Sequence, residues 1–313
     1  MMRYILLTLC LPYLAICKPN SSRLKEVDVK LYIFSEYNRD SGLEVLYENP
    51  KDDVPAVYYD KQKTNVFLIP GSNHTEFEKS LIPALLDTEK ANVFLFKWIH
   101  DGQDDEEWKE KSIADAGHLM SKFLLKLKKT LNLALEKTQL VGEGIGAHVA
   151  GEVGKKLNGE IFGIIGLDPT YPAGKEISKL GKTDAKRVEV IHTEGSAGYP
   201  SSMGTLDFFV NGGIVQPGCD KFNLKPEQQK ACSHSRSWLY YKESLQGGIF
   251  IGIKCSGYKY VKSLELEKCE GTYAILGGIN QPEKPKGDFY VLTRPDGPEF
   301  ALLNKKKPLT KIN

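Results

Sequence analysis

The sequence predicts an α/β fold in which a mostly parallel central sheet carries helices on both faces. Short apolar runs of strand length recur along the chain, and helical periodicity separates several of them. Strands that alternate with helices pair in parallel, and the helices then cover both faces of the sheet. The strands expected on this basis lie at 27–34, 65–69, 92–96, 138–141, 160–167 and 187–191.

The first strands differ in their apolar pattern. Residues 27–34 alternate between apolar and polar, which is typical of a strand with one buried face. Residues 65–69 and 92–96 are continuous apolar runs, and Pro70-Gly71 closes the first of them. A continuous run of that length is consistent with a strand buried on both faces.

The longest periodic segment predicts an amphipathic helix from about Lys111 to Thr130. Its apolar residues recur at steps of three and four, with lysines between them. A second helix is expected at 147–157, ended by Asn158-Gly159. After about Cys219 the periodicity weakens, and turns with short strands are expected there.

The N-terminus predicts a secretory signal peptide at 1–17. Arg3 supplies positive charge, an apolar run follows, and small residues precede Cys17. The run is too short to span a membrane, although a buried N-terminal helix is the alternative. We expect a secreted chain with no integral membrane association, one domain at 18–300 and a basic tail at 301–313. The net charge of +2 gives no reason to expect a nucleic-acid partner.

Four cysteines remain outside the signal peptide, and an even number in a secreted chain predicts two disulfides. Three connectivities are possible, and pairing between sequence neighbours is the simplest. The spacings lack the short C-x-x-C pairs of a zinc site. The cysteines are Cys219, Cys232, Cys255 and Cys269. Two N-glycosylation sequons begin at Asn20 and Asn73, although such triplets are often unused.

The stretch Val141–His148 reads VGEGIGAH and has the frame of a nucleophile elbow, G-x-S-x-G, with Gly144 at its centre. An elbow places its central residue on a strained turn between a strand and a helix, where flanking glycines permit close packing. The expected strand and helix lie on either side. The alternatives are an ordinary glycine-rich loop or a degenerate phosphate loop, which here lacks the lysine and Ser/Thr of a P-loop.

The partners of an elbow nucleophile follow in the order acid, then histidine. Asp168 ends an expected strand, which is where the acid belongs, although an Asp-Pro turn explains it equally well. His192 and His234 both follow Asp168, and position alone does not choose between them. No clustering predicts a metal site, and no cofactor is expected. The histidines that precede the acid fit the order poorly: His74, His100, His118 and His148.

These motifs resemble the pancreatic-lipase family, including insect phospholipases A1, gut lipases and the yolk proteins of flies. The resemblance implies an α/β-hydrolase fold, with Asp168 as acid, His234 as base and Gly144 where the serine stands. It also implies oxyanion donors from the backbone of Ile145 and Ser72. The segments that carry it are 97–98, 142–148, 166–169, 184–186, 190–193, 206–213, 217–219, 232–237 and 287–290.

The departures from the family point to lost catalysis. Gly144 has no side chain that could attack a carbonyl. Glu143 replaces a histidine common in active members, and in an intact elbow we expect Glu143 to point elsewhere and no nearby Ser or Thr side chain to reach the site. Pro70-Gly71-Ser72 replaces a His-Gly-aromatic oxyanion loop, and a glycan on Asn73 would crowd it.

Other departures concern the lid, calcium and the chain end. The segment at 220–230 that corresponds to the lid is short and polar, as in phospholipase A1 or yolk proteins. The calcium loop matches only at Asp184, whereas Lys179 and Gly181 depart from it, so no calcium is expected. The chain ends near the last strand of the catalytic domain, which leaves no room for a C-terminal β-sandwich or a colipase partner.

Three functions are compatible with this sequence. The leading expectation is a secreted, inactive member of the family that binds a lipid or other apolar molecule, or serves as a yolk-type store. The second is an active triacylglycerol lipase or phospholipase A1 with a different nucleophile. The third is an interaction module at an epithelial or egg surface that uses the fold as a scaffold.

Overall fold

The computed structural model describes residues 29–71, 75–88, 90–98, 106–170, 179–195, 201–220, 223–257, 265, 268–279 and 285–294, with side chains of α3 described from Lys111 onward. The expected signal peptide and basic tail, the sequons at Asn20 and Asn73, and Ser72 lie outside the described residues.

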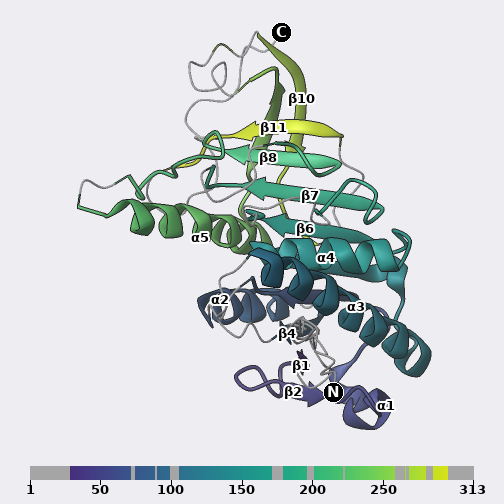
Figure 1. Cartoon of the computed structure of the whole chain (residues 1–313). Helices are drawn as coiled ribbons and strands as arrows, with labels where there is room; N and C mark the ends of the chain where they lie inside the picture. The colour runs from purple at the N-terminus through teal and green to yellow at the C-terminus, as the bar shows by residue number, and fades with distance from the viewer. Residues whose placement is uncertain are drawn as a thin grey trace, which may run out of the picture.

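The described strands form one sheet of 11 strands in the order β10-β9-β11-β8-β7-β6-β5-β3-β4-β1-β2. Pairing is parallel from β4 to β11 and antiparallel at both edges. This confirms the predicted mostly parallel α/β-hydrolase sheet (Figure 1). The strands are β1 Val29–Phe34, β2 Leu43–Val45, β3 Thr64–Ile69, β4 Ala91–Trp98, β5 Thr138–Glu143, β6 Gly163–Leu167, β7 Arg187–His192, β8 Leu206–Val210, β9 Ile251–Cys255, β10 Cys269–Ile275 and β11 Gly287–Val291.

Helices cover both faces of this sheet. α3 packs beside α4 on one face, and α2 packs beside α5 on the other (Figure 1). Successive side chains of β3 serve opposite faces: Phe67 belongs to the core under α3 and α4, whereas Leu68 belongs to the core under α2 and α5. The helices are α1 Pro50–Asp53, α2 Thr75–Leu86, α3 Glu106–Leu131, α4 Ile145–Lys156 and α5 Pro226–Leu245, with short 3-10 turns at Ala56–Tyr58 and Leu135–Lys137.

The sequence prediction was wrong in one large element. It gave only turns and short strands after Cys219, but the chain there forms α5, a helix of 20 residues. The buried face of α5 mixes small polar and aromatic residues, so it lacks the apolar periodicity on which the prediction depended. Its buried residues are Ser233, Ser237, Trp238, Tyr240 and Tyr241.

Two disulfides join sequence neighbours, as the simplest connectivity predicted. Cys219 pairs with Cys232 across a separation of 13 residues, and the bond fastens the loop after β8 to α5. Cys255 pairs with Cys269 across 14 residues and ties β9 to β10, where the two residues lie opposite each other. Among the described helices, none is long and apolar enough to cross a membrane.

Candidate active site

The elbow has the predicted strand-turn-helix form. Gly144 lies between β5 and α4, with φ 55° and ψ −122°. A side chain at Gly142 would lie 2.5 Å from the Cα of Ala147, and one at Gly146 would collide with the carbonyl of Ile69. These two glycines therefore let the first turn of α4 rest directly on the sheet, which holds Gly144 in this conformation.

Asp168 and His234 meet beside the elbow. Asp168 follows β6 with φ 45°, is fully buried, and accepts backbone N–H groups from Thr193 at 2.8 Å and Glu194 at 3.0 Å. Its other oxygen, Oδ2, lies 2.6 Å from Nδ1 of His234 on α5. The His234 side chain is 20% exposed, so one edge of the imidazole faces outward. The structure thus brings together the acid and base that the resemblance implied.

His192, the other candidate base, lies elsewhere. Its Nε2 is 2.9 Å from the carboxylate of Asp207, and its ring stacks on Phe209 with centroids 4.5 Å apart. Asp207 also accepts the backbone N–H of Met203 and Gly204. This second histidine–aspartate pair is buried and joins β7 to β8, which leaves His234 as the histidine of the site.

The position of residue 144 relative to His234 is well defined. A Cβ added to Gly144 would lie 3.4 Å from Nε2 of His234 and 3.1 Å from Oγ1 of Thr170. A serine hydroxyl is one bond beyond Cβ, so a serine at this position could come within hydrogen-bond reach of His234. The backbone therefore presents residue 144 to the histidine, but glycine supplies no group to activate.

The Glu143 carboxylate takes part in the site, contrary to the expectation that it would point elsewhere. Glu143 is only 2% exposed, and its Oε1 lies 3.7 Å from Nε2 of His234. Its Oε2 accepts the backbone N–H of Gly71 at 3.3 Å. The carboxylate of the residue before Gly144 thus approaches the nitrogen that a serine would need.

Carboxylates surround His234 and change its basicity. Burial lowers the pKa of His234, but the hydrogen bond and charge of Asp168, with the charges of Glu143 and Glu194, outweigh burial and raise it above the ordinary value. All three carboxylates belong to buried residues. The surrounding carboxylates therefore stabilise the protonated form of His234 relative to a free imidazole.

The oxyanion donors are only partly described. Ile145 is the first residue of α4, a position whose N–H has no partner within its own helix. Gly71 packs against it closely, since a Cβ there would lie 3.0 Å from the Ile145 nitrogen. Trp98 donates its indole N–H to the carbonyl of Pro70 at 3.0 Å, which anchors the start of this loop. Ser72, the other expected donor, lies outside the described residues.

His148 is a supporting residue that the sequence reasoning set aside because it precedes Asp168. It is fully buried on α4, and burial lowers its pKa to about 4. Its Nδ1 accepts the backbone N–H of Leu180 at 3.2 Å, so the proton of the neutral ring lies on Nε2 and is donated to the carbonyl of Thr170 at 3.0 Å. His148 thereby holds Thr170 beside Gly144.

The ammonium group of Lys155 lies at the segment that corresponds to the calcium loop of the family. Nζ of Lys155 lies 2.9 Å from Oδ2 of Asp184 and 2.7 Å from the carbonyl of Lys179. Gly181 donates its N–H to the same carboxylate oxygen. Burial raises the pKa of Asp184, and Lys155 offsets part of that effect. Within the described part of the chain, no cluster of three or more His, Cys, Asp or Glu side chains could hold a metal ion.

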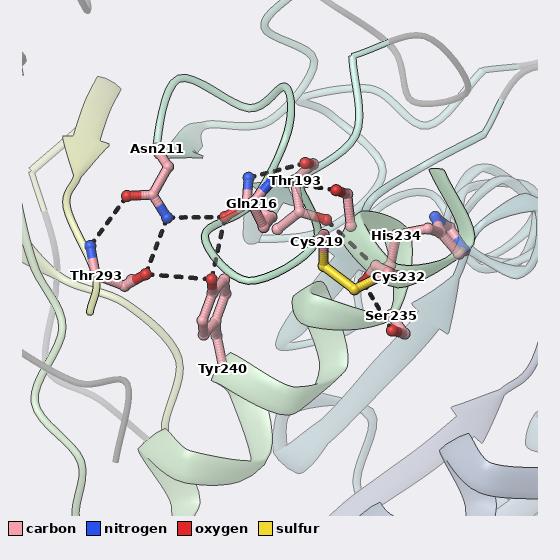
Figure 2. Close-up of a disulfide and its surroundings, with 10 residues drawn as sticks. Thr193, Asn211, Gln216, Cys219, Cys232, His234, Ser235, Tyr240 and Thr293 are labelled. Carbon is pink, nitrogen blue, oxygen red and sulfur yellow. Dashed lines mark hydrogen bonds between the residues drawn. A yellow bond between two sulfur atoms is a disulfide. The ribbon is translucent and has the colours of Figure 1, made fainter. Parts of the chain in front are cut away.

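The loop between β8 and Cys219 is held tightly to α5. Gln216 is fully buried, and its amide donates to the carbonyls of Thr193 and Val210, each at 2.8 Å. Its own N–H donates to the Ser233 hydroxyl at 3.1 Å. Figure 2 shows Gln216 at the centre of this network, with the Cys219–Cys232 disulfide and His234 on the same side of the loop.

The same loop exposes apolar side chains near the site. Ile214 is 55% exposed and Val215 is 44% exposed, although the residue that follows them is fully buried. Gly213, just before them, packs on His192, which directly precedes Thr193 and Glu194 beside Asp168. Exposed apolar side chains therefore lie on a loop that contacts Thr193 and Ser233, which are close in the chain to the partners of the Asp168–His234 pair.

The chain is similar in sequence to known lipases. Residues 13–295 match a family model described as Lipase. The chain is 29% identical to pancreatic triacylglycerol lipase of Sus scrofa, over 91% of this chain and 70% of that protein. It is 35% identical to Lipase member H-B of Xenopus laevis, over 58% of this chain and 40% of that protein.

Proposed function

The chain belongs to the lipase family, and from this premise we propose that it is a secreted member that lacks serine-dependent ester hydrolysis and binds a lipid or another apolar molecule, as a carrier or yolk-type store. The observation that carries the proposal is Gly144, which occupies an intact elbow beside the paired Asp168 and His234. Loss of a triad nucleophile costs roughly 10⁶-fold in a well-studied serine protease.

Ligand binding is supported by two features. Ile214 and Val215 expose apolar surface close to the pair. The relative from Sus scrofa is named as a triacylglycerol lipase, so its substrate is an apolar ester. A chain that keeps this scaffold without the nucleophile would retain an apolar ligand rather than cleave it.

Secretion is supported by the two disulfides, which persist in oxidising compartments. The expected signal peptide agrees with them, although it lies outside the described residues. We propose that the chain has no nucleic-acid partner, no colipase partner and no integral membrane association.

The alternative is an active carboxylic ester hydrolase, and the 2.6 Å contact between Asp168 and His234 favours it. The two functions are separated by incubating the purified wild-type chain with a short-chain p-nitrophenyl ester, a phospholipid and a fluorophosphonate probe. We expect neither turnover nor labelling. Turnover that His234→Ala abolishes would establish the alternative and overturn the proposal.

Bound ligand is tested on the same preparation. Organic extraction of the secreted protein, followed by mass spectrometry, should recover lipid in stoichiometric amount. Protein prepared in parallel with Ile214→Asp and Val215→Asp should yield less. Extracts of the wild type without lipid, together with no uptake of added acylglycerol, would contradict the binding role.

A further inference from the structure

The side chains of Glu143 and Thr170 lie next to Gly144, where each would interfere with catalysis by a serine. We infer that Glu143 and Thr170 form a second barrier to catalysis, in which Glu143 engages the base and Thr170 occupies the room of the nucleophile. The inference rests on the proposed function, because it concerns a site that already lacks its serine. It predicts that restoring the serine alone restores little activity.

The first part of the barrier is the engagement of His234 Nε2 by Glu143. A general base must present a free nitrogen within about 2.6–3.2 Å of the proton that it takes. Here Oε1 of the buried Glu143 lies 3.7 Å from that nitrogen. Among the described residues, Asp168 after β6 and Glu194 after β7 are the other charged groups that face His234, and both are carboxylates. Glu143 is the one that approaches Nε2.

This arrangement favours a proton on both ring nitrogens. Nδ1 faces Asp168 at 2.6 Å, and Nε2 faces Glu143. An imidazolium held between two buried carboxylates is stabilised by both, so it gives up its proton less readily than a histidine with one carboxylate partner. Because Glu143 also accepts the N–H of Gly71, its carboxylate is anchored in this place.

The second part of the barrier is the Thr170 side chain. Its Oγ1 would lie 3.1 Å from a Cβ on Gly144, which is closer than ordinary van der Waals contact. The backbone of Thr170 has little freedom to move away, because its carbonyl accepts the Nε2 proton of the buried His148. A serine at 144 would therefore have to displace the Thr170 side chain before it could turn toward His234.

The two contacts act on different requirements of the same reaction. Glu143 affects the protonation of the base, whereas Thr170 affects the orientation of the nucleophile. Groups that act as a unit combine non-additively. We therefore expect each single change to recover little and the combination to recover much more.

The test is a series of variants built on the full chain: Gly144→Ser, Gly144→Ser with Glu143→Gln, Gly144→Ser with Thr170→Ala, and the triple variant. Each is assayed with p-nitrophenyl butyrate and a fluorophosphonate probe at neutral pH. We expect the triple variant to exceed Gly144→Ser by about 100-fold or more, the lower end of what a general base contributes. A matched control replaces Glu143→Gln with Glu136→Gln, an exposed glutamate near the other end of β5.

The outcomes separate the inference from the proposed function. Hydrolysis by the wild type would overturn the proposed function. An inactive wild type with a Gly144→Ser variant within about threefold of the triple variant would overturn the inference alone, since one general base is worth 10²-fold or more. A folded triple variant without turnover would also overturn it.

A spectroscopic measurement keeps the inference testable if a combined variant fails to fold. The imidazole signals of His234 are followed by NMR during a pH titration of the wild type and of Glu143→Gln. We expect the pKa of His234 to be lower in Glu143→Gln than in the wild type, and unchanged in Glu136→Gln. Equal values in the wild type and Glu143→Gln would show that Glu143 does not engage the base.

Discussion

At the scale of single residues, Gly144 removes both the nucleophile and the strain that a nucleophile would carry. Its φ of 55° lies in a region that glycine adopts freely and other residues adopt at a cost of about 1–3 kcal/mol. The elbow conformation is therefore kept although residue 144 has no side chain, because the close contacts of Gly142 and Gly146 maintain the turn.

We predict that Gly144→Ser lowers the free energy of unfolding by roughly 1–3 kcal/mol, from backbone strain together with the Thr170 contact. Thermal and urea denaturation of the variant and the wild type measure the difference. Gly247→Ser is a suitable comparison, since Gly247 has φ 93° but no atom near its Cβ position. It carries backbone strain without a contact. A rise in melting temperature for Gly144→Ser would contradict the elbow conformation.

We predict that His234→Ala destabilises the protein by about 3–5 kcal/mol, the usual result of leaving a buried charge without its partner. Asp168 and Glu143 would both lose the imidazole that faces them. Removal of a working catalytic group more often leaves stability unchanged or raised. The measurement is chemical denaturation beside His118→Ala, which alters an exposed histidine on α3. Equal stability of wild type and His234→Ala would indicate that the pair is not structural.

At the scale of elements, α5 is fastened to the sheet by three different interactions. His234 contacts Asp168, Ser233 accepts the backbone N–H of Gln216, and Cys232 is bonded to Cys219. The helix that was hardest to predict from the sequence is therefore held by polar and covalent contacts as much as by apolar packing.

We predict that Gln216→Leu lowers the free energy of unfolding by roughly 2–4 kcal/mol, because the buried Thr193 carbonyl loses its side-chain donor and the Val210 carbonyl keeps the N–H of Gly213 but loses the amide. Urea denaturation measures the loss. Gln246→Leu, at the exposed end of α5, serves as the control and should stay close to the wild type. A Gln216→Leu variant as stable as the control would mean that other groups satisfy these carbonyls.

The segment that follows α4 leads to a prediction about metals. Since the ammonium group of Lys155 already contacts Asp184 and the Lys179 carbonyl, we expect neither EDTA nor added calcium to change the melting temperature. Lys155→Met should lower it, because Asp184 is 2% exposed and would keep a poorly compensated carboxylate. Stabilisation of the wild type by calcium in differential scanning calorimetry would refute this assignment.

At the scale of the whole molecule, the site lies at the carboxyl ends of the central parallel strands. The carboxyl ends of β5, β6 and β7 lead into Gly144, Asp168 and Thr193, and parallel pairing places these ends side by side. The apolar runs and their alternation with helices made this arrangement predictable from the sequence. The choice of His234 over His192 was not, because it required the resemblance and depends on how α5 packs.

The parts of the site that escaped prediction depend on side-chain direction. The Glu143 carboxylate lies 3.7 Å from Nε2 of His234, and Thr170 lies beside Gly144 with its carbonyl bonded to His148. Neither contact leaves a periodic or spacing signal in the sequence. The sequence shows a histidine at 148 but gives no indication that the Thr170 carbonyl is its hydrogen-bond partner.

The stability of the whole molecule should depend on pH through His234. Its pKa is raised in the folded state, so its contribution is fully present below the unfolded value of about 6.5 and is lost as pH rises through the folded value. The stability gap between wild type and His234→Ala should therefore be widest below that pH and narrow above it. Denaturation at a series of pH values tests the sign. A gap that widens as pH rises would contradict it.

The contact between Glu143 and His234 has a consequence for the history of the chain. The glycine codons GGU and GGC differ from the serine codons AGU and AGC by a single base, so a serine at residue 144 can be one mutation away. If Glu143 and Thr170 each block a restored serine, that mutation confers no benefit on which selection could act, and it carries the strain of the elbow. Glu143 and Thr170 would then prevent a single mutation at residue 144 from restoring hydrolysis, so a return to hydrolysis would require changes at several residues.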